Sequence, residues 1–458
     1  MKRFNWLIVL VVALAMFATA CGDGDAGTTT TAGDTGTTAT TAGDTGTTAT
    51  TAGDVMEEIT LRVFAGNVGQ ELELTKAGSQ RFMDANPGIT VEVIDTPDFV
   101  EDRLGVYLQL FEAQSSEGDV FQIDVIWPGD LAEHFVDLNE YGGAAIAEEH
   151  FPAIVQNNTV DGKLIGIPWF TDAGLLYYRT DLLEEYSLDP PTTWDELEAA
   201  AQTIQEGERA AGNQDFVGYV WQGNAYEGLT CDALEWVKSN GGGEIVSPDG
   251  VITINNADAI EIVDRAAGWV GTISPAGVTG WGEEDARGVW QAGNAAFMRN
   301  WPYAFSLGQA DDSVIKDLFD VSPLPAGKSG GGAATLGGWQ LAVSKYSEHP
   351  QEAADLAFFL ASYDEQKERA IVGSFNPTIE ALYSDADVLA ATPFFGPLYD
   401  VFTSAVARPS TVTAPQYSDA SSLFFGAVHS VLTGDNDAAT AFEELELDLV
   451  DLLDFPTG

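Results

Sequence analysis

The sequence predicts an α/β protein with two lobes, each built on an open and mostly parallel β-sheet. Its folded part begins near Met56 and continues for about 400 residues, which is too long for one simple hydrophobic core and long enough for two. Strand-like and helix-like segments alternate at the start of this region, an order that is typical of parallel sheets covered by helices.

The start of the folded part predicts three strands with two helices between them. Runs of β-branched and aromatic residues predict strands, and helical patterns lie between them, at 59–65, 70–85, 89–94, 103–113 and 119–127. In a sheet with this order the ligand site lies at the carboxyl ends of the strands. Asp124 and Trp127 lie at such an end, and Glu71 follows the first strand, so all three are candidate site residues.

The stretch from Ile167 to Tyr186, IPWFTDAGLLYYRTDLLEEY, is the part around which the rest of the chain is organised. A single carboxylate, Asp172, follows two aromatic residues and precedes a small-residue turn. GLLYYR then predicts a buried strand and TDLLEEY a helix. Burying an isolated carboxylate is costly, so Asp172 should face a cation or a hydrogen-bonding ligand. The alternative is a capped turn between strand and helix.

Helices and strands continue to the C-terminus. The clearest helix begins after Thr193, an N-cap that can form a capping box with Glu196. Further predicted elements are strands at 216–223 and 330–343, helices at 226–242 and 257–270, and a hairpin turn at 248–250.

The first residues have the composition of an export signal. Lys2 and Arg3 precede an almost wholly apolar segment at 6–19, which is too short to span a bilayer. The segment ends in Ala-Thr-Ala-Cys, which resembles a bacterial lipoprotein signal covering 1–21, with Cys21 as the acylated first mature residue. Cleavage before Cys21 without acylation is the alternative.

A low-complexity segment follows at 22–55. It consists mainly of Thr, Gly, Ala and Asp, in a repeat of the unit TAGDTGTTAT. Such a composition cannot form a core and predicts a disordered tether. Cys231 is the only other cysteine, so no disulfide is expected beside a lipid-anchored Cys21.

The chain is strongly acidic. It has 71 acidic residues against 19 basic ones, a formal net charge of −52. This charge makes nucleic acid and anionic membrane surfaces poor partners. Dense acid with scarce lysine resembles proteins adapted to high salt; the alternative is an ordinary acidic exported protein.

Catalytic and metal-binding signatures are weak in this sequence. No metal-binding spacing occurs among the histidines, and no G-x-S-x-G elbow is present. Gly327-Lys328-Ser329 lacks the first glycine of a phosphate loop, so we expect neither a metal nor a cofactor. Paired acids such as Glu283-Glu284-Asp285 could serve a glycoside hydrolase, but in so acidic a chain they are expected on a solvated face.

Aromatic residues recur beside glycines, prolines and single polar groups, at Trp127, Trp169, Phe170, Trp301, Tyr303 and Trp339. A sugar offers an apolar C–H face for stacking and a rim of hydroxyls for carboxylates and guanidinium groups. A single tryptophan is more often a core residue. Their repeated placement beside loop residues favours a sugar site.

Six stretches match a known family in order: DVFQIDVIW, DAGLLYYRTDLLEEY, GYVWQGNAYEGLTCD, GNAAFMRNWPYAF, ATLGGWQLAVSKYS and VARP. The chain from Ile59 onward resembles the trehalose/maltose-binding proteins, extracellular solute-binding proteins of ABC importers. The resemblance implies a two-lobed periplasmic-binding-protein-like fold of type II, with a three-segment hinge. Lobe I would comprise 56–170 and 340–374, and lobe II would comprise 171–339 and 375–458.

The resemblance also implies a set of sugar-binding residues: Glu71, Asp124, Asp172, Trp301, Tyr303, Gly338, Trp339 and Arg408. The match is poor around 96–103, so Asp98 and Arg103 are secondary candidates, as are Trp127 and Phe170. Phe170 stands where the family can have a tyrosine, which removes one hydroxyl and leaves the identity of the sugar open.

The predicted function is a lipoprotein receptor that binds an α-glucoside disaccharide, such as trehalose or maltose, for an ABC importer. It would be a monomer without enzymatic activity, held by its lipid anchor at the outer face of the cytoplasmic membrane. Its partners would be the permease subunits of the importer. The alternatives are a receptor for another oligosaccharide, a receptor that signals without transport, and a glycoside hydrolase.

Overall fold

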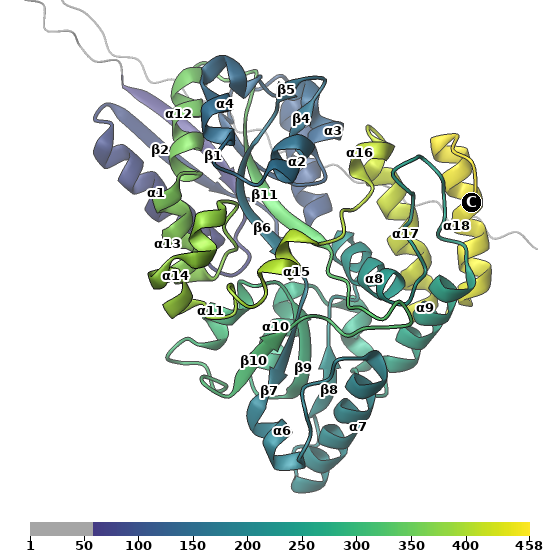
Figure 1. Ribbon diagram of the computed structural model, residues 1–458. Helices are drawn as coiled ribbons and strands as arrows, with labels where there is room; N and C mark the ends of the chain where they lie inside the picture. Colours follow the sequence, from purple (N-terminus) through teal and green to yellow (C-terminus); the bar gives the residue numbers. More distant parts are fainter. Residues whose placement is uncertain (1–57) are drawn as a thin grey trace, which may run out of the picture. The chain divides into compact units, whose positions relative to one another are not determined.

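The computed structural model describes residues 58–458 and contains two β-sheets, each with its own helices (Figure 1). The predicted export signal, Cys21 and the tether lie outside the described residues. Among residues 58–458, no helix has both the length and the apolar character that crossing a membrane requires.

The first sheet has five strands in the order β2-β1-β3-β11-β6. Their bounds are β1 (Ile59–Ala65), β2 (Ile89–Asp95), β3 (Val120–Asp124), β6 (Ile167–Ala173) and β11 (Leu336–Val343). The helices that belong with this sheet are α1 (Glu71–Ala85), α2 (Val100–Glu112), α12 (Pro350–Leu360) and α13 (Tyr363–Gly373). Helix α1 packs on β2 and α12 packs on β11. We call this sheet and its helices the first lobe.

The second sheet has four strands in the order β10-β7-β9-β8. Their bounds are β7 (Leu175–Arg179), β8 (Val217–Val220), β9 (Ala295–Asn300) and β10 (Phe319–Ser322). Helices α6 (Thr180–Tyr186), α7 (Trp194–Ala211) and α10 (Glu283–Gln291) pack on this sheet. A helical layer joins it, made of α8 (Glu227–Ser239), α9 (Ala257–Trp269), α17 (Tyr417–Leu432) and α18 (Ala438–Leu453). We call these elements the second lobe.

Short elements complete the described chain. They are α3 (Pro128–Leu131), α4 (Gly143–Ala147), α5 (Pro152–Asn157), β4 (Thr159–Val160), β5 (Lys163–Leu164), α11 (Ala304–Gly308), α14 (Ala386–Ala391), α15 (Tyr399–Thr403) and α16 (Ser410–Thr413). Four 3₁₀ turns lie at Ala132–His134, Leu138–Tyr141, Ala276–Gly280 and Glu380–Ser384.

The two-lobed α/β fold is confirmed, but the sheets are mixed rather than mostly parallel. Strand β1 is parallel to β2 and β3, whereas β11 is antiparallel to both β3 and β6. In the second sheet β8 is parallel to β9, and β7 is antiparallel to β9 and β10. Apolar runs indicate that a segment is a strand, but they do not tell its direction.

The individual elements follow the sequence patterns closely. The capping box of Thr193 and Glu196 is present at the start of α7. Helix α2 begins three residues before the predicted Arg103, and β3 ends at Asp124, so Trp127 is the N-cap residue of α3 instead of a strand residue. Asp172 lies within β6, not in a turn.

Three chain segments lie side by side where the lobes meet. The first passes from β6 to β7 through Gly174, where a Cβ atom would lie 2.1 Å from Oε1 of Glu235. The second is the start of β11, in which Gly338 has a φ of +118° and pairs with Thr171. The third contains Asn376, whose carbonyl accepts a hydrogen bond of 2.9 Å from the N–H of Thr171.

The lobe boundaries given above remain predictions. Helix α14 packs on α13 of the first lobe, whereas α17 packs on α8 of the second. These contacts place 386–391 beside the first lobe, although the prediction assigned 375–458 to lobe II.

Candidate ligand-binding site

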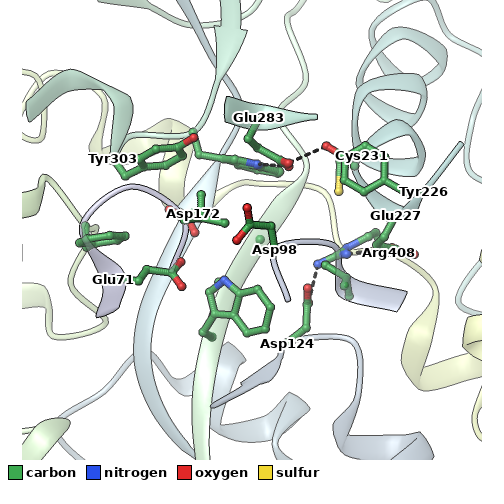
Figure 2. Close-up of a pocket in the computed structure, with 18 residues that line it drawn as sticks. Glu71, Asp98, Asp124, Asp172, Tyr226, Glu227, Cys231, Glu283, Tyr303 and Arg408 are labelled. Atoms are coloured by element: carbon green, nitrogen blue, oxygen red, sulfur yellow. Dashed lines mark hydrogen bonds and ion pairs between the residues drawn. The ribbon is translucent and has the colours of Figure 1, made fainter. Parts of the chain in front are cut away.

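A cleft between the lobes is lined by 18 residues (Figure 2). The space between its lining atoms is about 610 Å³, including the part that opens to solvent. Six carboxylates and one arginine line it: Glu71, Asp98, Asp124, Asp172, Glu227, Glu283 and Arg408. Figure 2 shows Asp98 between Glu71 and Tyr303 on one side and Glu227 and Arg408 on the other. The cleft is therefore rich in charged groups that face inward from both lobes.

The structure brings the eight main predicted site residues together. All eight line this cleft, and Asp98 joins them: Glu71, Asp124, Asp172, Trp301, Tyr303, Gly338, Trp339 and Arg408. The other three secondary candidates, Arg103, Trp127 and Phe170, do not line it; each is at most 1% exposed and packs behind the lining residues. Whether the lining residues bind a ligand stays a prediction.

Asp172 is a buried acid of the cleft without a protein partner among residues 58–458. It lies in β6, and its Oδ1 finds no hydrogen-bond partner among residues 58–458. Burial raises the pKa of Asp172 well above its usual range, and the charges of Glu71 and Asp124 add to this effect. A buried acid without a protein partner is suited to bonding a polar ligand, because its desolvation is otherwise uncompensated.

Glu71 is held by the first lobe. It is the first residue of α1, and its Oε2 accepts a hydrogen bond of 3.1 Å from Nε2 of Gln122. Burial raises the pKa of Glu71, although the nearby charge of Arg103 and the bond from Gln122 act in the opposite direction. The hydrogen bond from Gln122 therefore holds Oε2 of Glu71 and, with it, the orientation of Oε1.

Arg408 connects the two lobes at one end of the cleft. Its Nη2 lies 2.8 Å from Oδ1 of Asp124, at the end of β3, and its Nη1 lies 2.8 Å from Oε1 of Glu227, at the start of α8. Glu227 also accepts hydrogen bonds from the hydroxyls of Tyr417 and Ser421, at 2.5 and 2.6 Å. Paired charges of this kind are how a buried guanidinium is normally accommodated.

The aromatic side chains of the cleft are also fixed by polar bonds. Trp301 donates from Nε1 to Oε1 of Glu283 at 3.2 Å, and the hydroxyl of Tyr226 donates to Oε2 of the same carboxylate at 2.6 Å. Tyr303 donates to Oε1 of Glu284 at 2.7 Å. These bonds orient rings whose faces border the cleft, which is the arrangement that stacking on an apolar ligand face needs.

Two acidic residues of the cleft were not predicted. Glu283 was expected on a solvated face, but it lines the cleft and holds two aromatic side chains, whereas Asp285 accepts the N–H of Gly282 and caps α10. Glu227 was not singled out, although it follows β8 closely. The criterion that selected Asp124, an acid beyond the carboxyl end of a strand, would have found Glu227.

Among residues 58–458, no group of three or more histidine, cysteine or acidic side chains has an arrangement that could hold a metal ion.

Comparison with known proteins points to one family. Residues 66–367 match the family model of the bacterial extracellular solute-binding proteins. A probable ABC transporter-binding protein of Deinococcus radiodurans is 54% identical over 389 residues, which cover 85% of this chain and 92% of the relative.

Solved structures agree with this match. The maltose-bound MalE3 of T. maritima superimposes with a TM-score of 0.82 at 40% identity and covers 86% of this chain and 100% of its own. A solute-binding protein of Thermotoga lettingae TMO, solved with α-D-tagatose, has a TM-score of 0.77 at 23% identity over 87% of this chain and 100% of its own. At that lower identity the likeness concerns the fold alone.

Proposed function

Because this chain belongs to the bacterial extracellular solute-binding proteins, we propose that it is the sugar receptor of an ABC importer. We infer that its ligand is an α-linked glucose disaccharide, maltose or trehalose, held between the lobes. The observation that carries this proposal is the combination, in one cleft, of two indole rings with carboxylates and a guanidinium group from both lobes.

The chemistry of the cleft suits a sugar. Trp301 and Trp339 offer flat apolar surface for the C–H face of a pyranose ring, and Asp172, Asp124 and Arg408 offer planar groups for its hydroxyls. Both kinds of group are needed, because a sugar has an apolar face and a polar rim. The maltose bound by the 40% identical protein of T. maritima supports an α-glucoside as the ligand.

The ends of the cleft support a short ligand. At one end the backbone of Gly69 lies against the ring of Tyr303, so closely that a Cβ atom would be 2.4 Å from Cδ2 of the tyrosine. At the other end Phe99 packs edge-on against Tyr226, with ring centroids 5.0 Å apart. Glu101 accepts a hydrogen bond of 2.6 Å from the N–H of Glu227 beside it. Direct contacts between the lobes at both ends favour a disaccharide over a longer chain.

Three of the six acids of the cleft are engaged in a way that disfavours a role in hydrolysis. A glycoside hydrolase needs one carboxylic acid and one free carboxylate on either side of the scissile bond. Here Asp124 and Glu227 are both paired with Arg408, and Glu283 accepts two hydrogen bonds. These carboxylates are engaged in holding the cleft together.

The proposed partners follow from the family. We propose that the permease subunits of the importer receive the sugar, and that the acylated Cys21 anchors a monomeric protein outside the cytoplasmic membrane.

Calorimetric titration with maltose, trehalose, maltotriose and lactose tests the proposal. We expect saturable binding of one or both α-linked disaccharides, weaker binding of maltotriose and no binding of lactose. The same samples, analysed for free glucose after long incubation, should contain none. Binding of lactose alone would overturn the α-glucoside assignment, and release of glucose would favour the hydrolase.

A further inference from the structure

Each of the two cleft tryptophans has one ring face covered by a buried arginine. The Cζ atom of Arg299 lies 3.8 Å from the ring centroid of Trp301, and the Cζ atom of Arg103 lies 4.3 Å from that of Trp339. Both arginines are 0% exposed, and neither lines the cleft. A cation at this distance is attracted by the electron-rich face of an indole. Each arginine therefore covers one face of its ring.

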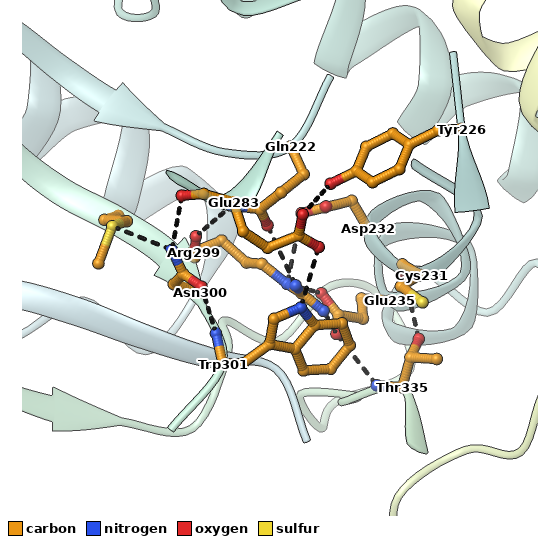
Figure 3. A network of polar contacts seen from close by, with 11 residues as sticks. Gln222, Tyr226, Cys231, Asp232, Glu235, Glu283, Arg299, Asn300, Trp301 and Thr335 are labelled. Carbon is orange, nitrogen blue, oxygen red and sulfur yellow. Dashed lines mark hydrogen bonds and ion pairs between the residues drawn. The ribbon is translucent and has the colours of Figure 1, made fainter. Parts of the chain in front are cut away.

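Arg299 is itself fixed by polar contacts at the edge of its guanidinium group (Figure 3). Its Nε and Nη2 donate to the two carboxylate oxygens of Glu235 at 2.9 and 2.6 Å, and its Nη1 donates to Oε1 of Gln222 at 3.1 Å. Asp232 lies 3.4 Å from Nε. A bidentate pair with a carboxylate sets the plane of a guanidinium group, so the plane on which Trp301 rests is set as well.

The remaining edges of Trp301 are also held. Its Nε1–H is bonded to Glu283, and its six-membered ring lies so close to the backbone of Gly337 that a Cβ atom there would be 3.2 Å from Cζ3. Asn300, the residue before Trp301, turns its Oδ1 back to accept the N–H of Trp301 at 2.7 Å. Trp301 is therefore held by its covered face, its Nε1–H and its backbone N–H.

Trp339 has a similar support in the first lobe. Arg103 covers one face, and Trp127 packs edge-on at a centroid distance of 5.9 Å. Arg103 donates from Nε to the carbonyl of Pro97 at 3.1 Å, and within residues 58–458 no carboxylate oxygen lies within 4.0 Å of its nitrogens. Stacking on Trp339 is therefore a principal contact of this guanidinium group.

Burying two guanidinium groups is energetically unfavourable, which indicates that these arrangements serve the cleft. The chain has 19 basic residues against 71 acidic ones, and a buried guanidinium is unfavourable unless it is paired or stacked. Each pair also lies within a single lobe: Arg103 and Trp339 in the first, Arg299 and Trp301 in the second. The arginine–tryptophan stacking in each pair therefore does not depend on whether the lobes are together or apart, whereas the contact of Trp301 with Gly337 of β11 does.

We propose that Arg103 and Arg299 are positioning residues that hold Trp339 and Trp301 as pre-formed stacking platforms, one on each lobe, before a ligand enters. A ring that is already fixed loses less rotational freedom on binding, so the ligand binds more tightly. That the ligand is a sugar rests on the proposed function, whereas the fixed state of the rings in the empty protein does not.

The first test uses the protein without ligand. Near-ultraviolet circular dichroism reports aromatic rings held in fixed tertiary packing. The contribution of Trp339 to the dichroism is obtained by subtracting the spectrum of Trp339→Leu from that of the wild type. The same difference is then measured between Arg103→Met and the double variant Arg103→Met, Trp339→Leu. We expect it to fall by about half or more, and the contribution of Trp301, measured in the same way, to be unchanged. An undiminished Trp339 contribution overturns the proposal.

The second test is a double-mutant cycle on maltose and trehalose affinity. Arg103→Met should weaken binding about tenfold in the wild type and less than twofold in Trp339→Leu, because its effect passes through the ring. In Trp301→Leu it should keep its full effect. An equal loss with and without Trp339 would show that Arg103 acts on the ligand or on the fold directly, which overturns the proposal.

The corresponding test of Arg299 needs a different reference protein from the wild type. Arg299→Met leaves Glu235 without its partner, so it is combined with Glu235→Gln and compared with Glu235→Gln alone. If these variants do not fold, the Arg103 arm still decides. Arg103→Met also removes a positive charge near Glu71 and Asp98, and the cycle with Trp339→Leu separates that loss from the effect on the ring. If the wild type binds neither disaccharide, the proposed function fails, and the dichroism measurement still decides the proposal on the platforms.

Discussion

The guanidinium group of Arg408 lies 2.8 Å from the carboxylate of Asp124, although the two residues are 284 positions apart in the chain. The same guanidinium binds Glu227 at 2.8 Å, so one buried cation joins β3 of the first lobe to α8 of the second. Both carboxylates line the cleft, and within the described part of the chain the other acids that line it form no ion pair with an arginine or lysine. Arg408 is therefore the main counter-ion for the acids of the cleft.

Replacing Arg408 by methionine should destabilise the protein by about 3–5 kcal/mol, because two buried carboxylates lose their counter-ion. Urea unfolding followed by far-ultraviolet circular dichroism measures the change. Lys328→Met is the matched control: it removes ion pairs with Asp258 and Glu261 in which all three side chains are about half exposed, and it should leave the midpoint unchanged. Equal stability of Arg408→Met and the wild type would contradict the structural role of this ion pair.

Replacing Asp172 by alanine should weaken disaccharide binding by roughly ten- to a hundredfold. Leaving a buried hydroxyl of the sugar without its hydrogen-bond partner costs about 1–3 kcal/mol, which corresponds to about that factor in Kd. Calorimetry provides the measurement, after each variant has shown the circular dichroism of the wild type. Glu184→Gln, an exposed change in α6, should bind as the wild type does; undiminished binding by Asp172→Ala would remove this acid from the site.

Glu101 should make stability fall as the pH rises through neutrality. It caps the N-terminus of α8 across the cleft, and burial, with the charges of Glu227 and Glu283, raises the pKa of Glu101 to about 7. The folded protein therefore binds a proton more tightly than the unfolded chain, so this stability is present below about pH 4.5 and is lost as the pH rises to about 7.

Glu101→Gln keeps the acceptor and removes the titration. Between pH 5 and pH 8 the wild type should lose up to about 3 kcal/mol more unfolding free energy than this variant. Urea unfolding at several pH values gives both curves, and other carboxyls cancel in their difference. Parallel curves would show that the Glu101 carboxyl titrates normally.

Gly69→Ala should weaken ligand binding with little effect on the fold of either lobe. The added methyl would overlap the ring of Tyr303 in the opposite lobe, with a Cβ to Cδ2 distance of 2.4 Å. It would oppose the closed arrangement and so reduce affinity in proportion to the population of that state. Gly434→Ala is the control, since its φ of +77° is similar and no atom lies within 4 Å of the added Cβ. A similar affinity of both variants would show that this contact does not limit closure.

Added salt should raise the melting temperature. A formal net charge of −52 places many like charges on a compact surface, and their repulsion is screened as the Debye length falls to about 3 Å at 1 M salt. Melting is followed by circular dichroism from low salt to about 1 M sodium chloride. A flat or falling curve would argue against an acidic surface adapted to high salt.

Much of the site could be anticipated because local patterns place residues at the ends of strands. Asp124 follows an apolar run and Glu71 opens a helix just after the first strand, and both line the cleft. Arg103 shows the limit of such reasoning: it was a secondary candidate for a ligand contact, but it lies behind Trp339. Helical spacing indicates which side of α2 is buried and does not distinguish the cleft from the layer behind it.

The sequence by itself determined the alternation of strands and helices, the division into two lobes and the aromatic and acidic character of the site. These follow from hydrophobic periodicity, capping residues and composition, which are local properties of the chain. Tertiary structure alone decided the antiparallel direction of β11, the pairing of Arg408 with Asp124 and Glu227, and the place of Glu283 in the lining of the cleft. These depend on which distant segments meet, and side-chain charges find their partners only when the packing of both lobes has brought them within a few ångströms.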